Sequence, residues 1–213
     1  MISNELQCRF GYNTPITSEE IVSIFGKYTR AYVFRMIKRA LDSGELMLFS
    51  RGVYYIPRNT VFGQTKITPE QVAEKKYIKE NGEFFGVYAG LKNLNQFGVT
   101  EQIPNTIEIV TNKEATRKRK ITINGKEFIL RKSRCIITSD NYHEYNLLQL
   151  FSDMDEKDKI DDFVREKINK YINNNRVDKE KLLCMAVYFP KKCLNNLIRS
   201  GVLNESLWIN TGL

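Results

Sequence analysis

Four side chains with the chemistry for contacting a nucleic acid are spaced along one short segment of this sequence. They are Tyr32, Arg35, Lys38 and Arg39, and intervals of three and four residues place them on one side of an α-helix. An arginine can donate two hydrogen bonds to a guanine edge, a lysine can neutralise a phosphate, and an α-helix fits the major groove of DNA. The spacing therefore predicts a groove-binding helix, although Asp42 lies on the same side and would face the DNA backbone unfavourably.

The other side of the same segment is apolar. Hydrophobic residues recur there at positions i, i+3, i+4, i+7 and i+8, namely Val33, Met36, Ile37, Ala40 and Leu41. This pattern predicts an amphipathic helix over residues 29–42, followed by Gly44. We expect Thr29, at the start of this helix, to belong to the DNA-contacting set.

The residues before this helix predict another one. Residues 17–20 (TSEE) have the pattern of a capping box, in which the side chains of Thr17 and Glu20 each accept a hydrogen bond from the other's backbone N–H. Apolar residues at helical spacing follow. Gly26 is expected to end this helix in the left-handed conformation.

A short hairpin is expected directly after the second helix. Residues 45–49 and 53–57 are prone to form strands, and they flank Ser50-Arg51-Gly52, whose glycine can adopt the positive φ of a tight loop. Two helices followed by a hairpin predict a winged helix-turn-helix. Arg51 at the tip and Arg58 just beyond it would then meet phosphates or the minor groove.

An alternative interpretation of this region stays open. A pair of amphipathic helices with a hairpin is also a common packing unit, and exposed cations often form only a solvated face. The agreement of cap, turn, periodicity and hairpin favours DNA binding.

A second basic segment lies further along the chain. Residues 113–134 contain nine lysines or arginines and two glutamates. Two β-prone runs, 120–123 and 127–131, flank Asn124-Gly125, which predicts a basic β-hairpin. Either these cations form a second patch for a nucleic acid or a protein partner, or they protect a polar sheet edge from self-pairing. The residues of this candidate patch are Arg117, Lys118, Arg119, Lys120, Arg131, Lys132 and Arg134.

The rest of the sequence alternates between helical and strand patterns. Residues 69–79 follow the helix-start signal Thr68-Pro69, with Asn81-Gly82 expected to end the helix. Residues 84–97 predict a second helix closed by a glycine, and residues 106–111 predict a short strand. Helical spacing dominates from residue 141 onward.

Together these patterns predict an α+β protein of three parts. The chain has 213 residues, of which 42% are hydrophobic and 27% charged, with a net charge of +8, so it can form a substantial core. We expect a winged helix-turn-helix in residues 1–60 and a mixed α/β domain in residues 61–139. A helical bundle in residues 140–213 is expected to pack on the middle domain.

Several classes of protein are not expected. The first residues lack a signal-peptide pattern and no apolar run is long enough to span a bilayer, so we expect a cytoplasmic protein without a membrane partner. The cysteines are scattered and His143 is the single histidine, which argues against a metal site or disulfide framework. Glu108 is the only acid on a predicted core strand. We therefore expect no cofactor, no catalytic residues and no enzymatic activity.

Three segments taken together resemble a known family of bacterial proteins. They are RGVYYIP at residues 51–57, YAGL at residues 88–91 followed by FGVTEQIP at residues 97–104 and the strand at residues 107–111, and YFP at residues 188–190 before a leucine-rich helix. In this order they are similar to segments of the AbiEi-like antitoxins of type IV (abortive infection) toxin-antitoxin systems, and closest to a branch of unknown function. The sequence departs from the family pattern at Phe189, where tyrosine is usual, and in the short segment before Thr17.

The resemblance implies a role for each end of the chain. In that family an N-terminal winged helix represses the protein's own operon, and the C-terminal region counters a nucleotidyltransferase-like toxin. Carried onto this sequence, it implies operator contact by Tyr32, Arg35, Lys38, Arg39 and Arg51. It further implies antagonism of the toxin by a surface after residue 62, without indicating which residues form it.

We therefore expect a DNA-binding antitoxin and transcriptional autorepressor. Two copies on an inverted repeat are expected, because one winged helix contacts too few base pairs for operator-level specificity. Two alternatives from other classes stay open. One is a stand-alone winged-helix transcriptional regulator, and the other is a DNA-targeted, magnesium-dependent nuclease that uses Glu108.

Overall fold

The computed structural model describes residues 2–155 and 157–204, so the ends of the predicted first and third domains lie partly outside the described residues. The chain forms two compact units, residues 1–75 and residues 76–213, called here the first and second units. Helices and small, mostly antiparallel sheets alternate along the chain, which makes the fold mixed α and β, consistent with the α+β class.

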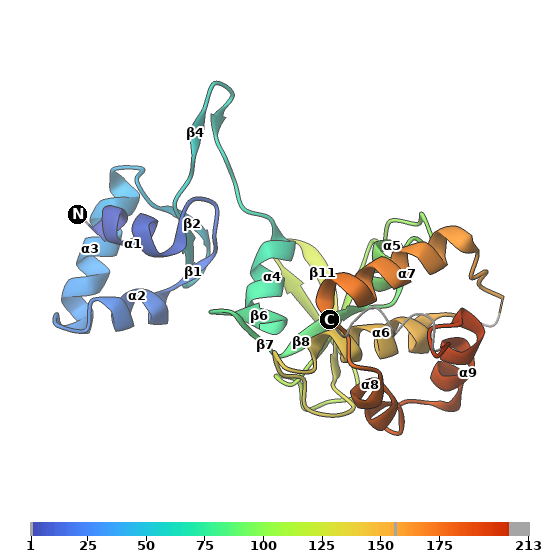
Figure 1. Ribbon diagram of the computed structural model, residues 1–213. Helices are drawn as coiled ribbons and strands as arrows, with labels where there is room; N and C mark the ends of the chain where they lie inside the picture. Colours follow the sequence, from blue (N-terminus) through green and yellow to red (C-terminus); the bar gives the residue numbers. More distant parts are fainter. Residues whose placement is uncertain (1, 156, 205–213) are drawn as a thin grey trace. The chain divides into compact units, whose positions relative to one another are not determined.

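The first unit contains three complete helices and five short paired strands among its described residues (Figure 1). In chain order its elements are α1 (Ile2–Phe10), β1 (Ile16–Thr17), α2 (Ser18–Ile24), α3 (Arg30–Asp42), β2 (Met47–Ser50), β3 (Val53–Tyr55), β4 (Asn59–Thr60) and β5 (Gly63–Gln64). Strand β3 lies between β1 and β2 and is antiparallel to both. Strands β4 and β5 pair only with each other.

One apolar core holds the helices of the first unit against its small sheet. Leu6 of α1, Ile21 of α2 and Val33 and Ile37 of α3 are buried together with Ile16 of β1. Each such side chain contributes ~1.5–3 kcal/mol by leaving water. The apolar stripe predicted for residues 29–42 therefore packs inward, which orients the rest of α3.

The start of α2 and the position of its end are confirmed, but the left-handed conformation expected at Gly26 is wrong. The Glu20 N–H donates to the Thr17 hydroxyl, and the Thr17 N–H donates to the Glu20 carboxylate at 2.8 Å. At the other end, Phe25 caps the helix with φ −98° and ψ 30°, and its N–H donates to the Ile21 carbonyl. Because buried Phe25 already turns the chain, Gly26 keeps a negative φ instead of the expected left-handed conformation.

The second unit is built on a four-stranded sheet with the order β10-β11-β9-β8. Strands β9 and β11 are parallel, and the other neighbours are antiparallel. The division between the units falls inside α4 (Pro69–Tyr77). The elements that follow are β6 (Lys79–Glu80), β7 (Glu83–Phe84), β8 (Gly86–Ala89), α5 (Leu91–Gln96), β9 (Ile107–Thr111), β10 (Arg119–Ile123), β11 (Lys126–Lys132), α6 (Tyr142–Asp153), α7 (Asp162–Asn175), α8 (Lys179–Ala186) and α9 (Lys191–Ser200).

The helix predicted over residues 84–97 is wrong in its first half. Residues 86–89 form β8 instead, paired with β9, and only residues 91–96 are helical. A Cβ on Gly86 would lie 2.0 Å from the Tyr77 carbonyl oxygen, so glycine allows β8 to approach the end of α4. Asn81-Gly82 forms the two-residue turn of the hairpin β6–β7, with positive φ at both residues, and does not directly end the helix.

Helix α6 lies at the centre of the second unit. Its residues from Glu144 to Phe151 are all buried, and it packs on β8, α8 and α9. A helix that is buried on all sides must satisfy its polar side chains internally. Glu144 does so by accepting from the Asp178 N–H at 2.9 Å. Within residues 2–155 and 157–204, no helix combines the length and apolar character needed to cross a membrane.

Candidate nucleic-acid interface

Helix α3 exposes the residues that the sequence predicts to contact DNA. The Thr29 hydroxyl caps the helix by accepting from the Tyr32 N–H at 3.4 Å. Val33, Ile37 and Ala40 are buried on the inner side. The outer side carries a set that we call the basic helix face, all of it exposed to solvent: Thr29, Tyr32, Arg35, Lys38 and Arg39.

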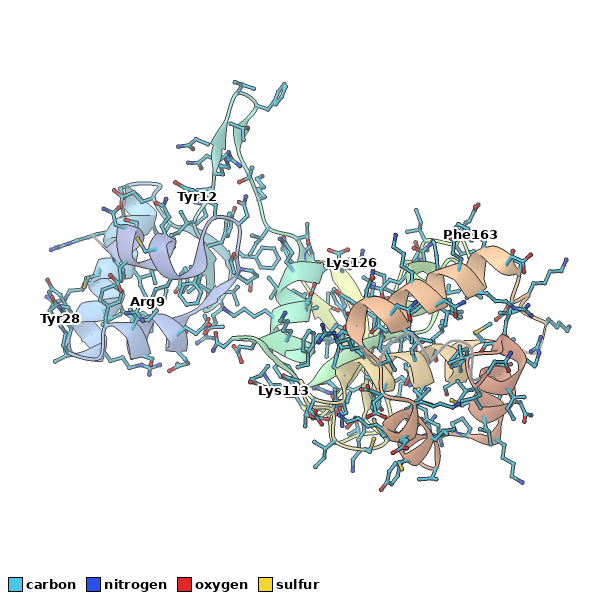
Figure 2. All side chains as sticks on the ribbon, in the orientation of Figure 1. Arg9, Tyr12, Tyr28, Lys113, Lys126 and Phe163 are labelled. Carbon is cyan, nitrogen blue, oxygen red and sulfur yellow. The ribbon has the colours of Figure 1, made fainter. Side chains whose placement is uncertain are left out.

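Aromatic rings support the cations at the start of this face. The Arg35 guanidinium lies over the Tyr32 ring at 5.4 Å, and the Tyr32 ring is 5.1 Å from the Tyr28 ring. Lys27 in turn lies over Tyr28 at 5.1 Å. Tyr28 lies at the junction between α2 and α3 (Figure 2). We did not predict Lys27 and Tyr28 as site residues, although the four-residue spacing of the two tyrosines was a usable signal.

Two acids at the start of α2, Glu19 and Glu20, are paired with cations that do not belong to this face. Arg30 donates two hydrogen bonds to the Glu19 carboxylate, at 2.7 and 3.1 Å, and these bonds together with the charge of Arg30 lower the pKa of Glu19. The Glu20 carboxylate forms an ion pair with the Lys75 ammonium group at 2.7 Å. None of the three cations of the basic helix face is in an ion pair within the described part of the chain. The face therefore keeps its positive charge, with exposed Asp42 at its end.

A groove runs beside the basic helix face. It has a volume of about 370 Å³ and is bordered by Tyr32, Met36 and Arg39 on α3 and by Ile2 at the start of α1. Tyr32 and Arg39 thus lie at the margin of the face, next to α1. Arg35 and Lys38 do not border the groove and lie on the exposed part of the face.

The hairpin β2–β3 presents Arg51 at its tip. Gly52 has a φ of +77°, as the tight loop requires, and its carbonyl accepts from the Ser18 N–H at 2.9 Å. This bond fixes the tip beside the start of α2. The side chains of Arg51 and of Arg58, three residues past β3, are exposed.

A further hairpin, β4–β5, was missed by the sequence analysis. It stands out from the helices of its unit in Figure 1, and its tip residues Val61 and Phe62 are 94% and 98% exposed. Its base is held by Thr65, whose hydroxyl accepts from the Arg58 N–H at 2.9 Å. Gly63, with φ +103°, was the only signal for this turn.

The second unit divides the other candidate patch into two groups. Arg119 and Lys120, on the edge strand β10, pair with Glu114 and Glu127. The other members border a cleft of about 980 Å³: Arg117, Lys118, Arg131, Lys132 and Arg134. Glu108 also borders this cleft and accepts from Arg131 at 2.9 Å.

The residues considered for catalysis lie in ordinary structural settings. The His143 ring nitrogen Nδ1 is 2.9 Å from the Tyr171 hydroxyl, and burial lowers the pKa of His143. The described residues contain no group of three or more histidine, cysteine, aspartate or glutamate side chains placed to hold a metal ion. The absence of enzymatic activity stays a prediction.

Comparison with known proteins does not assign the chain to a family. No protein-family model matches the chain, and no curated protein sequence matches it. The resemblance to AbiEi-like antitoxins therefore depends on the three sequence segments alone.

Proposed function

We propose that the first unit is a winged helix-turn-helix that binds duplex DNA through the basic helix face. The order α1, β1, α2, α3, β2, β3 and the sheet order β1-β3-β2 support this interpretation. In this arrangement α3 is the recognition helix, and β2–β3 is the wing that carries Arg51. The observation that carries the proposal is that Arg35, Lys38 and Arg39 are exposed and have no ion-pair partner among the described residues.

The chemistry of the face fits DNA in two ways. Arg35 and Lys38 lie one helical turn apart on the outer side, so both can enter one groove. The ring of Tyr32 restricts the Arg35 side chain, which lowers the entropy lost when the guanidinium binds a base. Phosphate contacts supply most of the affinity and make it dependent on salt.

We further propose that the chain is the antitoxin and autorepressor of a toxin-antitoxin operon. This part is supported by the resemblance in residues 51–57, 88–111 and 188–190. The partner would be a nucleotidyltransferase-like toxin encoded beside it. The residues that contact the toxin remain to be found.

The DNA-binding half is tested with the full chain and the DNA upstream of its gene. We expect Arg35→Ala with Lys38→Ala to weaken binding at least about tenfold in a fluorescence anisotropy titration. The matched control is Arg165→Ala with Lys191→Ala, which removes two exposed charges from α7 and α9 of the second unit. Equal losses in both variants would show that only the net charge matters and would move the interface away from α3.

The antitoxin half is tested by co-expression with the neighbouring gene. An antitoxin restores growth when that gene is toxic, whereas a stand-alone regulator binds the DNA equally well and restores nothing. The double variant of α3 separates the two activities further. If it still rescues growth while repression is lost, the toxin-directed surface lies outside the basic helix face.

A further inference from the structure

The second unit contains a concave cationic site that the DNA-binding proposal does not use. We call it the cationic cleft. It has a volume of about 980 Å³ and is formed by the turn before β10, the end of β11, strand β9 and α6. Its lining residues with charged or amide side chains are Glu108, Arg117, Lys118, Arg131, Lys132, Arg134 and Gln149.

One wall of the cleft is fixed by a buried carboxylate. Glu114 accepts from the Thr116 N–H at 3.0 Å, from the Thr116 hydroxyl at 2.7 Å and from Arg119 at 2.7 Å. Although burial raises the pKa of Glu114, these bonds and the charge of Arg119 lower it to about 2. The Lys132 N–H donates to the Thr116 carbonyl at 3.2 Å, which joins the turn to β11. Residues 117 and 118 therefore follow directly after a turn that these hydrogen bonds hold in place.

A second wall, at the end of β11 and just after it, is fixed in a similar way. The Arg134 N–H donates to the hydroxyl of fully buried Tyr145 at 2.9 Å, and the Arg134 guanidinium lies over the Phe189 ring. The Ser133 hydroxyl donates to the Asn112 side chain at 2.9 Å. These bonds fix the backbone that carries the cations before any ligand arrives, and the Phe189 ring supports the Arg134 guanidinium. Both reduce the ordering cost of binding.

The charges of the cleft are unbalanced. Glu108 neutralises Arg131, and within residues 2–155 and 157–204 the cations Arg117, Lys118, Lys132 and Arg134 have no carboxylate partner. Holding like charges around one cavity raises the free energy of the folded state, since they repel each other. An anion with several negative oxygens would remove this cost.

The inner part of the cleft has a different chemistry. Gln149 is 1% exposed, and its amide donates to the Asp153 carboxylate at 2.9 Å. The Glu108 carboxylate beside it is about three-quarters covered, with 28% of the side chain exposed. Carboxylate oxygens accept hydrogen bonds and repel phosphate. A matching ligand therefore has phosphates at one end and N–H or O–H donors at the other.

We propose that the cationic cleft binds a nucleotide, with its phosphates against Arg117, Lys118, Lys132 and Arg134 and its base or sugar donors toward Glu108. The nucleotide is either free or part of a single strand. This site is independent of the basic helix face, so it holds whether or not the first unit binds duplex DNA.

Binding is measured with the full chain carrying Arg35→Ala and Lys38→Ala, so that the basic helix face does not contribute. The probes are ATP, by isothermal titration calorimetry, and a 5′-phosphorylated ten-nucleotide DNA strand, by anisotropy. We expect the double variant Lys118→Glu with Arg134→Glu to lower the affinity for whichever probe binds more tightly by at least about tenfold. The control variant Arg165→Glu with Lys191→Glu, whose substitutions lie outside the cleft, should change that affinity less than about twofold. Circular dichroism melts check that both variants fold.

Each outcome is informative. Tighter binding of ATP assigns a free nucleotide, and tighter binding of the strand assigns a nucleic acid. Binding of both probes weaker than about 1 mM, or equal losses in the two charge-reversal variants, overturns the proposal.

Glu108 tests the orientation of the nucleotide. Glu108→Ala removes a negative charge and an acceptor and leaves Arg131 unpaired. We expect it to tighten the binding of inorganic triphosphate and to lower the ratio of ATP affinity to triphosphate affinity at least about threefold. An unchanged ratio would contradict the placement of the base or sugar at Glu108.

Discussion

The two cationic regions of this molecule differ in shape and in how their side chains are held. The basic helix face is convex, its cations stand on one helix, and the neighbouring acids pair with other residues such as Arg30 and Lys75. The cationic cleft is concave, its cations come from two walls fixed by hydrogen bonds, and it includes the acid Glu108. A convex helix can enter a groove of duplex DNA, whereas a concave site encloses a smaller ligand. Positive charge alone therefore does not define one shared function.

The sharpest test of this comparison is whether each region depends on its own core. Ile37→Ala in the first unit should cost about 2–5 kcal/mol, and Phe151→Ala in the second about 3–5 kcal/mol, since both side chains are buried. We expect Ile37→Ala to raise hydrogen exchange in residues 1–75 and to weaken duplex binding without changing ATP binding. Phe151→Ala should raise hydrogen exchange in the second unit and weaken ATP binding without changing duplex binding. Exchange that rises in both units from either change would contradict their independence.

The next prediction concerns the wall of the cleft that Glu114 fixes. Because the folded-state pKa of Glu114 is lowered to about 2, its contribution to stability is present above its unfolded pKa. That contribution is lost as the pH falls from about 4.5 toward 2. Glu114→Gln should therefore flatten the acid limb of the stability curve of the second unit, measured by urea unfolding between these pH values.

The same substitution separates the two regions at neutral pH. Glu114→Gln weakens the bonds to Thr116 and Arg119 and so loosens residues 117 and 118. We expect ATP binding to weaken about threefold to tenfold, with duplex binding unchanged. A parallel loss of duplex binding would show that the two sites are not separate.

Much of the first unit could be predicted because its signals are local. The capping box of residues 17–20, the apolar period of residues 29–42 and Gly52 each depend on neighbours within a few residues. The exposed side of α3 follows directly from that period. The hairpin β4–β5 was missed because its strands have only two residues each, too few for an alternating pattern.

The second unit was harder to predict because long-range pairing decides its elements. Val87, Tyr88 and Ala89 have side chains compatible with a helix, and the pairing of residues 86–89 with β9 makes this segment a strand. The cleft could be anticipated only in part. Its cations are clustered in the sequence, but Glu108 and Gln149 reach it from β9 and α6. The boundaries of the three predicted domains remain predictions.

A smaller effect is expected at the tip of the hairpin β2–β3. Arg51→Ala should weaken duplex binding about twofold to fivefold and reduce the slope of log K against log salt by about 0.9, the value for one lost phosphate contact. Lys118→Ala in the cleft should leave that slope unchanged. Titrations at several salt concentrations measure both. A slope unaffected by Arg51→Ala would remove the hairpin from the proposed interface.

The smallest predicted effect concerns Asp42, the exposed acid at the end of the basic helix face. If the whole length of α3 lies along the DNA, this carboxylate repels the phosphates, and Asp42→Asn should tighten duplex binding about twofold at low salt. The gain should vanish at high salt because screening removes the repulsion. If instead the helix leaves the groove before its last turn, Asp42→Asn changes nothing while Arg35→Ala still weakens binding. The two substitutions together thus locate the point along α3 where contact with DNA ends.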